Sequence, residues 1–158
     1  MSIGWSSLTL TPSDSAIHQL AESWGWLLPN YFVPLLFSNF GDLFYQPESG
    51  GVWWLNTGTA EVTQVADSVS QFRELLGTEV ANEWFMPHLV EELHAAGKVP
   101  GPGECYSYVI LPVFAEGSYE VENFNPVPAH EHFAITGNIF NEIQSLPSGA
   151  KVKLNVVP

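Results

Sequence analysis

Positive charge is scarce in this chain. Four lysine and arginine residues stand against 17 aspartates and glutamates, which gives a formal net charge of −13 at pH 7. A surface field of this sign repels nucleic-acid phosphates and anionic lipid headgroups. Direct binding to DNA, RNA or a membrane surface is therefore disfavoured, whereas binding to a basic protein is not. The plainer interpretation is that the acidity only keeps the protein soluble.

Cysteine and long apolar runs are also scarce. Cys105 is the single cysteine, so an intrachain disulfide and a cysteine-based zinc site are both excluded, which suits a reducing cytosol. Its neighbour Glu104 and the apolar run that follows predict a buried structural thiol rather than a nucleophile. No stretch reaches the ~18 apolar residues of a membrane span, and residues 1–7 do not read as an export signal. We expect a soluble, cytoplasmic protein.

Sequence signatures of catalysis are missing as well. The chain has no Gly-x-Ser-x-Gly elbow, no phosphate-binding glycine loop and no His-Glu-x-x-His helix. Adjacent carboxylates such as Glu91 and Glu92 diverge on a helix, which is poor geometry for paired acid and base catalysis. We therefore predict no catalytic residues, no cofactor and a non-enzymatic protein.

Aromatic and branched residues are plentiful, and they predict one α+β domain over residues 1–158. The chain is 46% hydrophobic and 13% aromatic, enough for a packed core. The central feature is residues 41–65, where three short strands at 42–45, 52–55 and 60–65 are separated by turns rich in glycine. This pattern predicts an antiparallel meander. Trp53 and Trp54 are adjacent in its middle strand, so their side chains point to opposite faces.

The remaining elements follow from capping residues and apolar periodicity. Ser13 or Asp14, and Asp67 or Ser68, are expected to cap helices, and Pro87 is expected to kink or break a third helix. The predicted helices cover residues 13–28, 68–76, 78–96 and 136–145. Further strands are predicted at 105–111, 118–124, 129–135 and 151–156, with a turn at 125–128. The expected fold is an antiparallel sheet, made of the meander and the C-terminal strands, with helices packed mainly on one face.

Two histidines raise an alternative function. His130 and His132 fall in the strand predicted at 129–135, where residues two apart share a face, and metals use such a spacing. A third ligand would be needed, and the spacing predicts none. The alternative is therefore a small metal-dependent enzyme or ligand-binding domain that uses this pair, against ordinary hydrogen-bonded or surface histidines.

Several sequence blocks, in their order and spacing, resemble one known family. They are FGDLF at 40–44, VWWLNTG at 52–58, VADSV at 65–69 with Phe72, WFMPHLVEEL at 84–93, GK at 97–98, PG at 102–103 with CY at 105–106, GSYE at 117–120 with Asn123, and the segments 132–137 and 146–149. Together they are similar to the C-terminal domain of immunity proteins against type VI secretion DNase effectors, a family long catalogued as a domain of unknown function. The family-like region covers about residues 24–153. Ala115 and Glu116 depart from the pattern, because further glycine is expected before Gly117.

The resemblance implies a cytoplasmic bacterial protein that binds and neutralises a cognate toxin, and it carries over no catalytic residues. Charge supports the same function, since an acidic surface attracts a basic, nuclease-like partner. A housekeeping module that binds another partner is a further alternative, because a fold does not fix a function. The predicted partner contacts lie on the helix at 78–96 and near residues 116–122. They are Glu79, Glu83, Glu91, Glu92, Glu116, Glu120 and Glu122.

Overall fold

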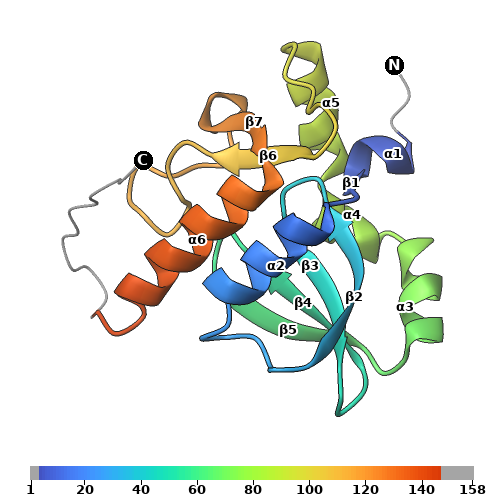
Figure 1. The fold of residues 1–158 in the computed structure, drawn as a ribbon. Helices are drawn as coiled ribbons and strands as arrows, with labels where there is room; N and C mark the ends of the chain where they lie inside the picture. The colour runs from blue at the N-terminus through green and yellow to red at the C-terminus, as the bar shows by residue number, and fades with distance from the viewer. Residues whose placement is uncertain (1–3, 147–158) are drawn as a thin grey trace.

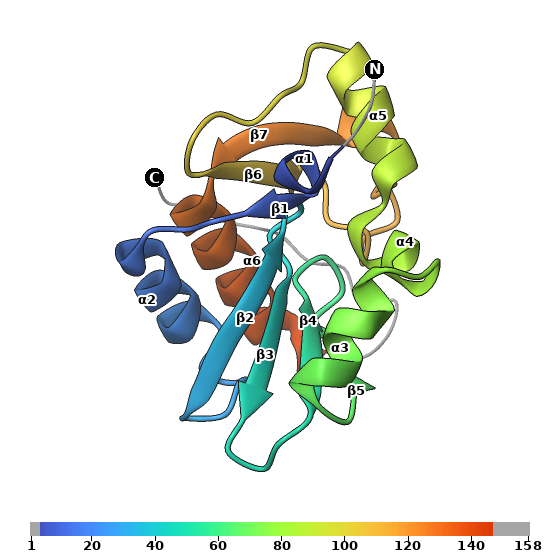
Figure 2. The same cartoon turned by 90° about the vertical axis from the view of Figure 1, so that its right-hand side faces the viewer.

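The main sheet has five antiparallel strands in the order β1-β2-β3-β4-β5. A computed structural model describes residues 4–146 of the chain, shown in two views in Figures 1 and 2. A second, two-stranded antiparallel sheet pairs β6 with β7. The strands are β1 (Thr9–Leu10), β2 (Phe32–Ser38), β3 (Leu43–Pro47), β4 (Val52–Asn56), β5 (Glu61–Ala66), β6 (Glu104–Tyr108) and β7 (Phe124–Pro128).

Six α-helices and one short 3-10 helix connect these strands within the described residues. They are α1 (Trp5–Leu8), α2 (Asp14–Ser23), α3 (Val69–Leu76), α4 (Val80–Phe85), α5 (Pro87–Ala95), η1 (Val121–Asn123) and α6 (Ala129–Ile143). Between residues 4 and 146, no helix is both long enough and apolar enough to cross a membrane. The predicted α+β class is confirmed.

Strands β3, β4 and β5 form the predicted meander. Tyr45 pairs with Trp53 across the first hairpin, and Gly50 and Gly51 in its turn have φ angles of 90° and 76°. Glycine is favoured there because side chains rarely adopt positive φ. Leu55 pairs with Val62 in the second hairpin. The local turn signals therefore place the strands correctly.

Helices cover both faces of the main sheet, so the expectation that they pack mainly on one face is wrong. On one face, Leu43 and Leu55 pack with α2 and α6. On the other, Phe44 and Val52 pack with α3 and α4. In Figure 2, α2 lies to the left of the sheet and α6 passes behind it, whereas α3 lies in front of the sheet and, with α4, toward the right. As predicted, Trp53 and Trp54 belong to the opposite layers.

Capping residues set the helix starts that the sequence predicts. The Ser13 Oγ accepts a 3.1 Å hydrogen bond from the amide of Ala16 at the start of α2. The Ser68 Oγ accepts a bond of the same length from the amide of Gln71 at the start of α3. Each bond satisfies an amide that has no partner within its helix. The expected interruption at Pro87 is a full break, because it separates α4 from α5.

The C-terminal third differs most from the sequence-based prediction. Residues 129–135, predicted as a strand, begin helix α6, and residues 125–128, predicted as a turn, belong to strand β7. β7 has a single neighbour, so its prolines are tolerated as they are in edge strands. Residues 118–124, predicted as a strand, contain a bend, η1 and only the first residue of β7. β6 and β7 form their own sheet rather than extending the meander. The strand predicted at 151–156 lies outside the described residues.

Gly137 allows α2 and α6 to pack closely. A Cβ atom on Gly137 would lie 2.5 Å from the carbonyl oxygen of Ser23 and 2.7 Å from its carbonyl carbon. We expect Gly137→Ala to lower the free energy of unfolding by about 1–3 kcal/mol, because the helices must separate. Urea denaturation measures this loss. Asn138→Ala, at an exposed neighbouring position on α6, should change stability by less than about 0.5 kcal/mol. Equal stabilities for the two variants would contradict the close packing.

Candidate functional site

A groove of about 580 Å³ runs between α5 and the segment that precedes η1. Glu91 and Glu92 come from α5, and Tyr119 and Glu120 come from the opposite wall. In Figure 2 the segment after β6 passes beside α4 and α5 at the upper right of the view. The groove therefore brings together carboxylates from two parts of the chain. We call it the acidic groove; its other lining residues are Asn82, Met86, Pro87, His88 and Leu89.

The break between α4 and α5 shapes one wall of the acidic groove. Met86 adopts the left-handed conformation, with φ 46° and ψ 58°, which ends α4 and reorients the chain. Pro87 then occupies the first turn of α5, where its missing N–H is not needed. Val90 and Leu93 are buried on the inner side of α5, so Glu91 and Glu92 are left exposed.

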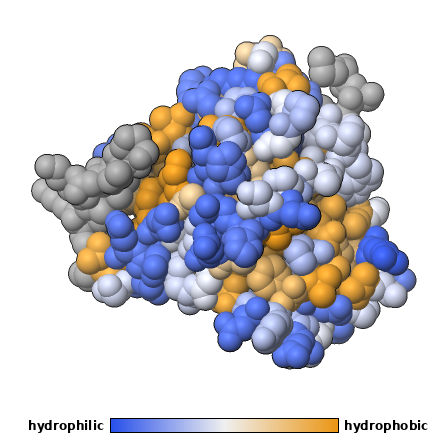
Figure 3. Space-filling view, in the orientation of Figure 1, coloured by the Kyte–Doolittle hydropathy of each residue, from blue (hydrophilic) through white to orange (hydrophobic). Residues whose placement is uncertain are grey.

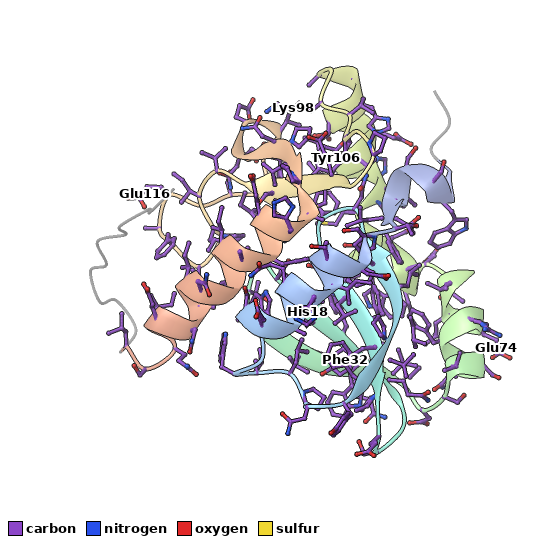
Figure 4. All side chains as sticks on the ribbon, in the orientation of Figure 1. His18, Phe32, Glu74, Lys98, Tyr106 and Glu116 are labelled. Carbon is purple, nitrogen blue, oxygen red and sulfur yellow. The ribbon has the colours of Figure 1, made fainter. Side chains whose placement is uncertain are left out.

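Side-chain hydrogen bonds hold the opposite wall in place. The Asn123 amide nitrogen donates to the carbonyl oxygens of Ile110 and Ser118, each at 2.7 Å, and the Asn123 Oδ1 accepts from the amide of Ile110 at 2.8 Å. The Lys98 Nζ donates to the carbonyl oxygens of Val121 and Phe124 at 2.9 and 2.8 Å; Figure 4 labels Lys98 above β6. These hydrogen bonds fix the position of the segment that carries Tyr119 and Glu120.

A smaller cavity of about 260 Å³ adjoins the acidic groove, and Met86 and Tyr119 line both spaces. We call it the aromatic cavity, because Trp54, Trp84 and Tyr108 line it together with Tyr119. Its polar lining residues are Asp42, Asn56 and Glu83. It therefore combines aromatic rings with two carboxylates.

Asp42 is the buried acid of the aromatic cavity, with 3% of its surface exposed. Its Oδ1 accepts hydrogen bonds from the Thr57 amide at 2.9 Å and the Thr57 hydroxyl at 3.1 Å. Its Oδ2 accepts one long bond of 3.3 Å from the Trp54 Nε1. Burial raises the pKa of Asp42 to about 7, although the bonds from Thr57 and Trp54 oppose that rise.

A chain of buried hydrogen bonds leads from Asp42 into the interior. The Thr57 hydroxyl lies 2.8 Å from the His132 Nε2, and the His132 Nδ1 lies 2.7 Å from the Ser107 hydroxyl. Burial lowers the pKa of His132 to about 4, so the ring is neutral at pH 7. If the Thr57 hydroxyl donates to Asp42, Nε2 carries the ring proton and Nδ1 accepts from Ser107. Each donor in this series of hydrogen bonds then has an acceptor.

The predicted contact residues separate into two groups. Glu91, Glu92 and Glu120 line the acidic groove, and Glu83 lines the aromatic cavity. Glu79, Glu116 and Glu122 are exposed and line neither space. Figure 4 shows Glu116 at the left of the view, across the molecule from Glu74 on α3. Four of the seven predicted residues are thus brought together.

The two histidines are not arranged as predicted. Both lie on α6 rather than on a strand, where residues two apart point in different directions. His132 is fully buried, and hydroxyls occupy both of its ring nitrogens, whereas His130 is exposed. Within residues 4–146, no cluster of three or more histidine, cysteine, aspartate or glutamate side chains could hold a metal ion. The shared face that motivated the metal hypothesis is therefore missing from the described structure.

A larger groove of about 860 Å³ lies elsewhere, between α2 and the segments around residues 30–34 and 46–50. Tyr31 and Val33 line it and are 73% and 58% exposed. Figure 3 shows apolar surface at the lower right of the view, over β2, and mainly hydrophilic surface over the centre. None of the seven predicted acidic residues lines this groove.

Sequence reasoning missed the aromatic cavity and the buried chain behind it. One local signal was available: Asp42 is a charged residue that directly precedes the apolar run Leu43-Phe44-Tyr45, and a carboxylate in such a position needs partners or a function. Tyr108 and Tyr119 carry no comparable signal, since exposed and core tyrosines look alike in a sequence.

Comparison with known families identifies the part of the chain that carries the acidic groove. Residues 66–140 match the family model described as T6SS immunity protein Tdi1, C-terminal. The resemblance seen in the sequence is therefore confirmed, and it supports an immunity-type function. The matched segment contains Glu83, Glu91, Glu92 and Glu120, whereas Asp42 and Trp54 precede it. No curated protein matches the chain.

A solved structure shares the fold. The crystal structure of Atu4351 from Agrobacterium tumefaciens matches with a TM-score of 0.53 and 20% sequence identity, over 82% of this chain and 65% of that chain. At this identity the likeness establishes a common fold and nothing more. This chain spans about 65% of the length of that relative.

Proposed function

We propose that this chain, whose residues 66–140 match the C-terminal domain of T6SS immunity protein Tdi1, binds and neutralises a cognate protein toxin through the acidic groove. The supporting observation is that Glu91, Glu92 and Glu120 converge on one groove inside the family-matched segment. The protein neutralises the toxin by binding to it rather than by catalysing a reaction. It does so in the cytoplasm, where a delivered toxin would act.

Charge defines the class of toxin. The net charge of −13 favours a basic partner, and opposite charges speed association by steering the two proteins together. A nuclease is such a partner, because its substrate groove must be cationic to hold phosphates. Carboxylates that project from a groove wall compete with those phosphates for the same lysines and arginines. The chain would thereby block access of nucleic acid to the toxin.

Charge reversal in the acidic groove tests this function. The triple variant Glu91→Lys, Glu92→Lys and Glu120→Lys should weaken binding to the toxin encoded beside this gene by about a hundredfold or more, equal to roughly 3 kcal/mol. Calorimetric titration measures the affinity, and co-expression in a bacterium measures protection. Loss of affinity should be accompanied by loss of protection.

The matched control reverses the same number of charges elsewhere. Glu22, Glu74 and Glu142 are exposed on α2, α3 and α6, so their triple lysine variant has the same net charge as the groove variant. We expect it to slow association less than about tenfold and to keep protection. Equal losses for both variants would show that only net charge matters. Absence of binding by the unmodified protein would reject the toxin-binding function.

A further inference from the structure

We propose that the aromatic cavity receives the guanidinium group of one arginine side chain from the toxin. This inference rests on the proposed function, because it names the group that enters beside the acidic groove. Met86 and Tyr119 line both spaces, so a partner seated in the groove lies next to the cavity. The arginine would anchor the partner, while the groove glutamates contact the charged surface around it.

The walls of the aromatic cavity suit a flat cation. Two tryptophans and two tyrosines line it, and cations are attracted to the faces of such rings. Guanidinium is planar and weakly hydrated, so it stacks on aromatic rings more readily than a lysine ammonium does. The volume of about 260 Å³ exceeds the roughly 30 Å³ that one water molecule occupies in the liquid. The cavity therefore has room for the four heavy atoms of a guanidinium group.

Asp42 supplies a buried acceptor that the protein itself satisfies incompletely. The hydrogen-bond donors to its carboxylate among the described residues are the neutral groups of Thr57 and Trp54. The Oδ2 receives a single bond, at 3.3 Å, although a carboxylate oxygen can accept two. A guanidinium N–H would donate the second hydrogen bond to this oxygen. The site is desolvated, and charge-assisted hydrogen bonds are strongest in such a setting. Glu83, exposed on α4, provides a second carboxylate in the lining.

Arginine binding should depend on pH in one direction. The raised pKa of Asp42, about 7, means that the buried acid holds a proton below neutral pH, and this proton must leave when a cation binds. Affinity should therefore rise by about tenfold between pH 6 and pH 8. The other titratable groups near Asp42 with shifted pKa values stay neutral in this range. Desolvation raises the pKa of the Cys105 thiol and of the Tyr108 and Tyr119 phenols further above it, and burial lowers the pKa of His132, behind Thr57, to about 4. Glu83 is the other carboxylate in the lining.

Titration with N-acetyl-arginine amide tests the cavity without the toxin. We expect saturable shifts of the Trp54 indole N–H resonance in nitrogen-proton spectra, with a dissociation constant in the millimolar range. The citrulline analogue has the same shape without the charge and should give no saturable shift. Asp42→Asn should weaken arginine binding by about tenfold or more, since the amide preserves the acceptor for Thr57 but removes the charge. Glu74→Gln, at an exposed position on α3, should bind as the unmodified protein does.

Two outcomes of the probe titration with the unmodified protein would overturn the inference. One is the absence of saturable shifts with the arginine probe; the other is equal binding of the arginine and citrulline probes. If Asp42→Asn fails to fold, Glu83→Gln and Tyr119→Ala serve instead, because both positions are exposed. Each should weaken the arginine probe by about threefold or more. Unchanged binding by both variants would also reject the site.

A parallel measurement with the toxin separates this inference from the proposed function. If the toxin binds tightly and equally to the unmodified protein and to Tyr119→Ala, and the arginine probe does not bind, the arginine pocket is wrong while toxin binding stands. If the arginine probe binds but the toxin does not, the pocket is real and the immunity function is wrong.

Discussion

Replacing Phe44 by alanine should lower the free energy of unfolding by about 3–5 kcal/mol. Phe44 is fully buried on β3, and its ring centre lies 5.1 Å from that of Phe72 on α3 and 5.2 Å from that of Trp84 on α4. Removing it leaves a void between the sheet and the helices that precede the acidic groove. Denaturation by urea, followed by tryptophan fluorescence, measures the loss.

Two companion variants make this result specific. Phe44→Leu keeps most of the apolar volume and should lose only about 1–1.5 kcal/mol. Tyr31→Ala removes an aromatic ring that is 73% exposed and should change stability by less than about 0.5 kcal/mol. A loss below about 1 kcal/mol for Phe44→Ala would mean that α3 and α4 do not depend on this packing.

The second large effect concerns the pH dependence of stability in Asp42→Asn. When the pH is lowered from 6.5 to 4.5, the free energy of unfolding of this variant should fall by about 3 kcal/mol more than that of the unmodified protein. The reason is that two buried groups oppose each other in the unmodified protein, and the substitution removes one of them. Urea denaturation at several pH values provides the comparison.

The sign of each contribution follows from the direction of its pKa shift. His132 has its pKa lowered from 6.5 to about 4, so below pH 6.5 the unfolded chain takes up a proton that the folded protein does not. Stability then falls on acidification by about 1.4 kcal/mol per pH unit. Asp42 has its pKa raised from 3.8 to about 7, so the folded protein holds the extra proton and acidification adds stability. Between about pH 4 and 6.5 the two slopes cancel.

Histidine variants check the assignment from the other side. His132→Gln should show the opposite change, with stability rising on acidification relative to the unmodified protein, because only Asp42 then contributes. His130→Gln, at an exposed position on the same helix, should keep the original profile. A profile for Asp42→Asn that parallels the unmodified protein would contradict a protonated, buried Asp42.

Periodicity explains why α6 was not predicted correctly. The sequence-based prediction divided this segment into a strand at 129–135 and a helix at 136–145, yet the buried positions of α6 are Ala129, His132, Phe133, Thr136, Gly137 and Phe140. That spacing of three and four is the helical period, and it becomes clear only when the polar His132 and Thr136 are counted as buried. Their burial depends on Thr57, Ser107 and Trp24, which come from distant parts of the chain.

The sequence by itself determined what short-range chemistry controls. The glycines at 50–51 fixed the first hairpin of the meander, Ser13 and Ser68 fixed helix starts, and Pro87 ended α4, because each signal acts on the backbone within a few residues. The same sequence also set the net charge and the family resemblance. Tertiary structure alone decided which carboxylates meet: Glu120 joins Glu91 and Glu92 across a groove, and Asp42 becomes a buried acid beside aromatic rings. Such contacts join residues far apart in the chain, and burial, which sets the pKa values of Asp42 and His132, exists only once those segments have packed.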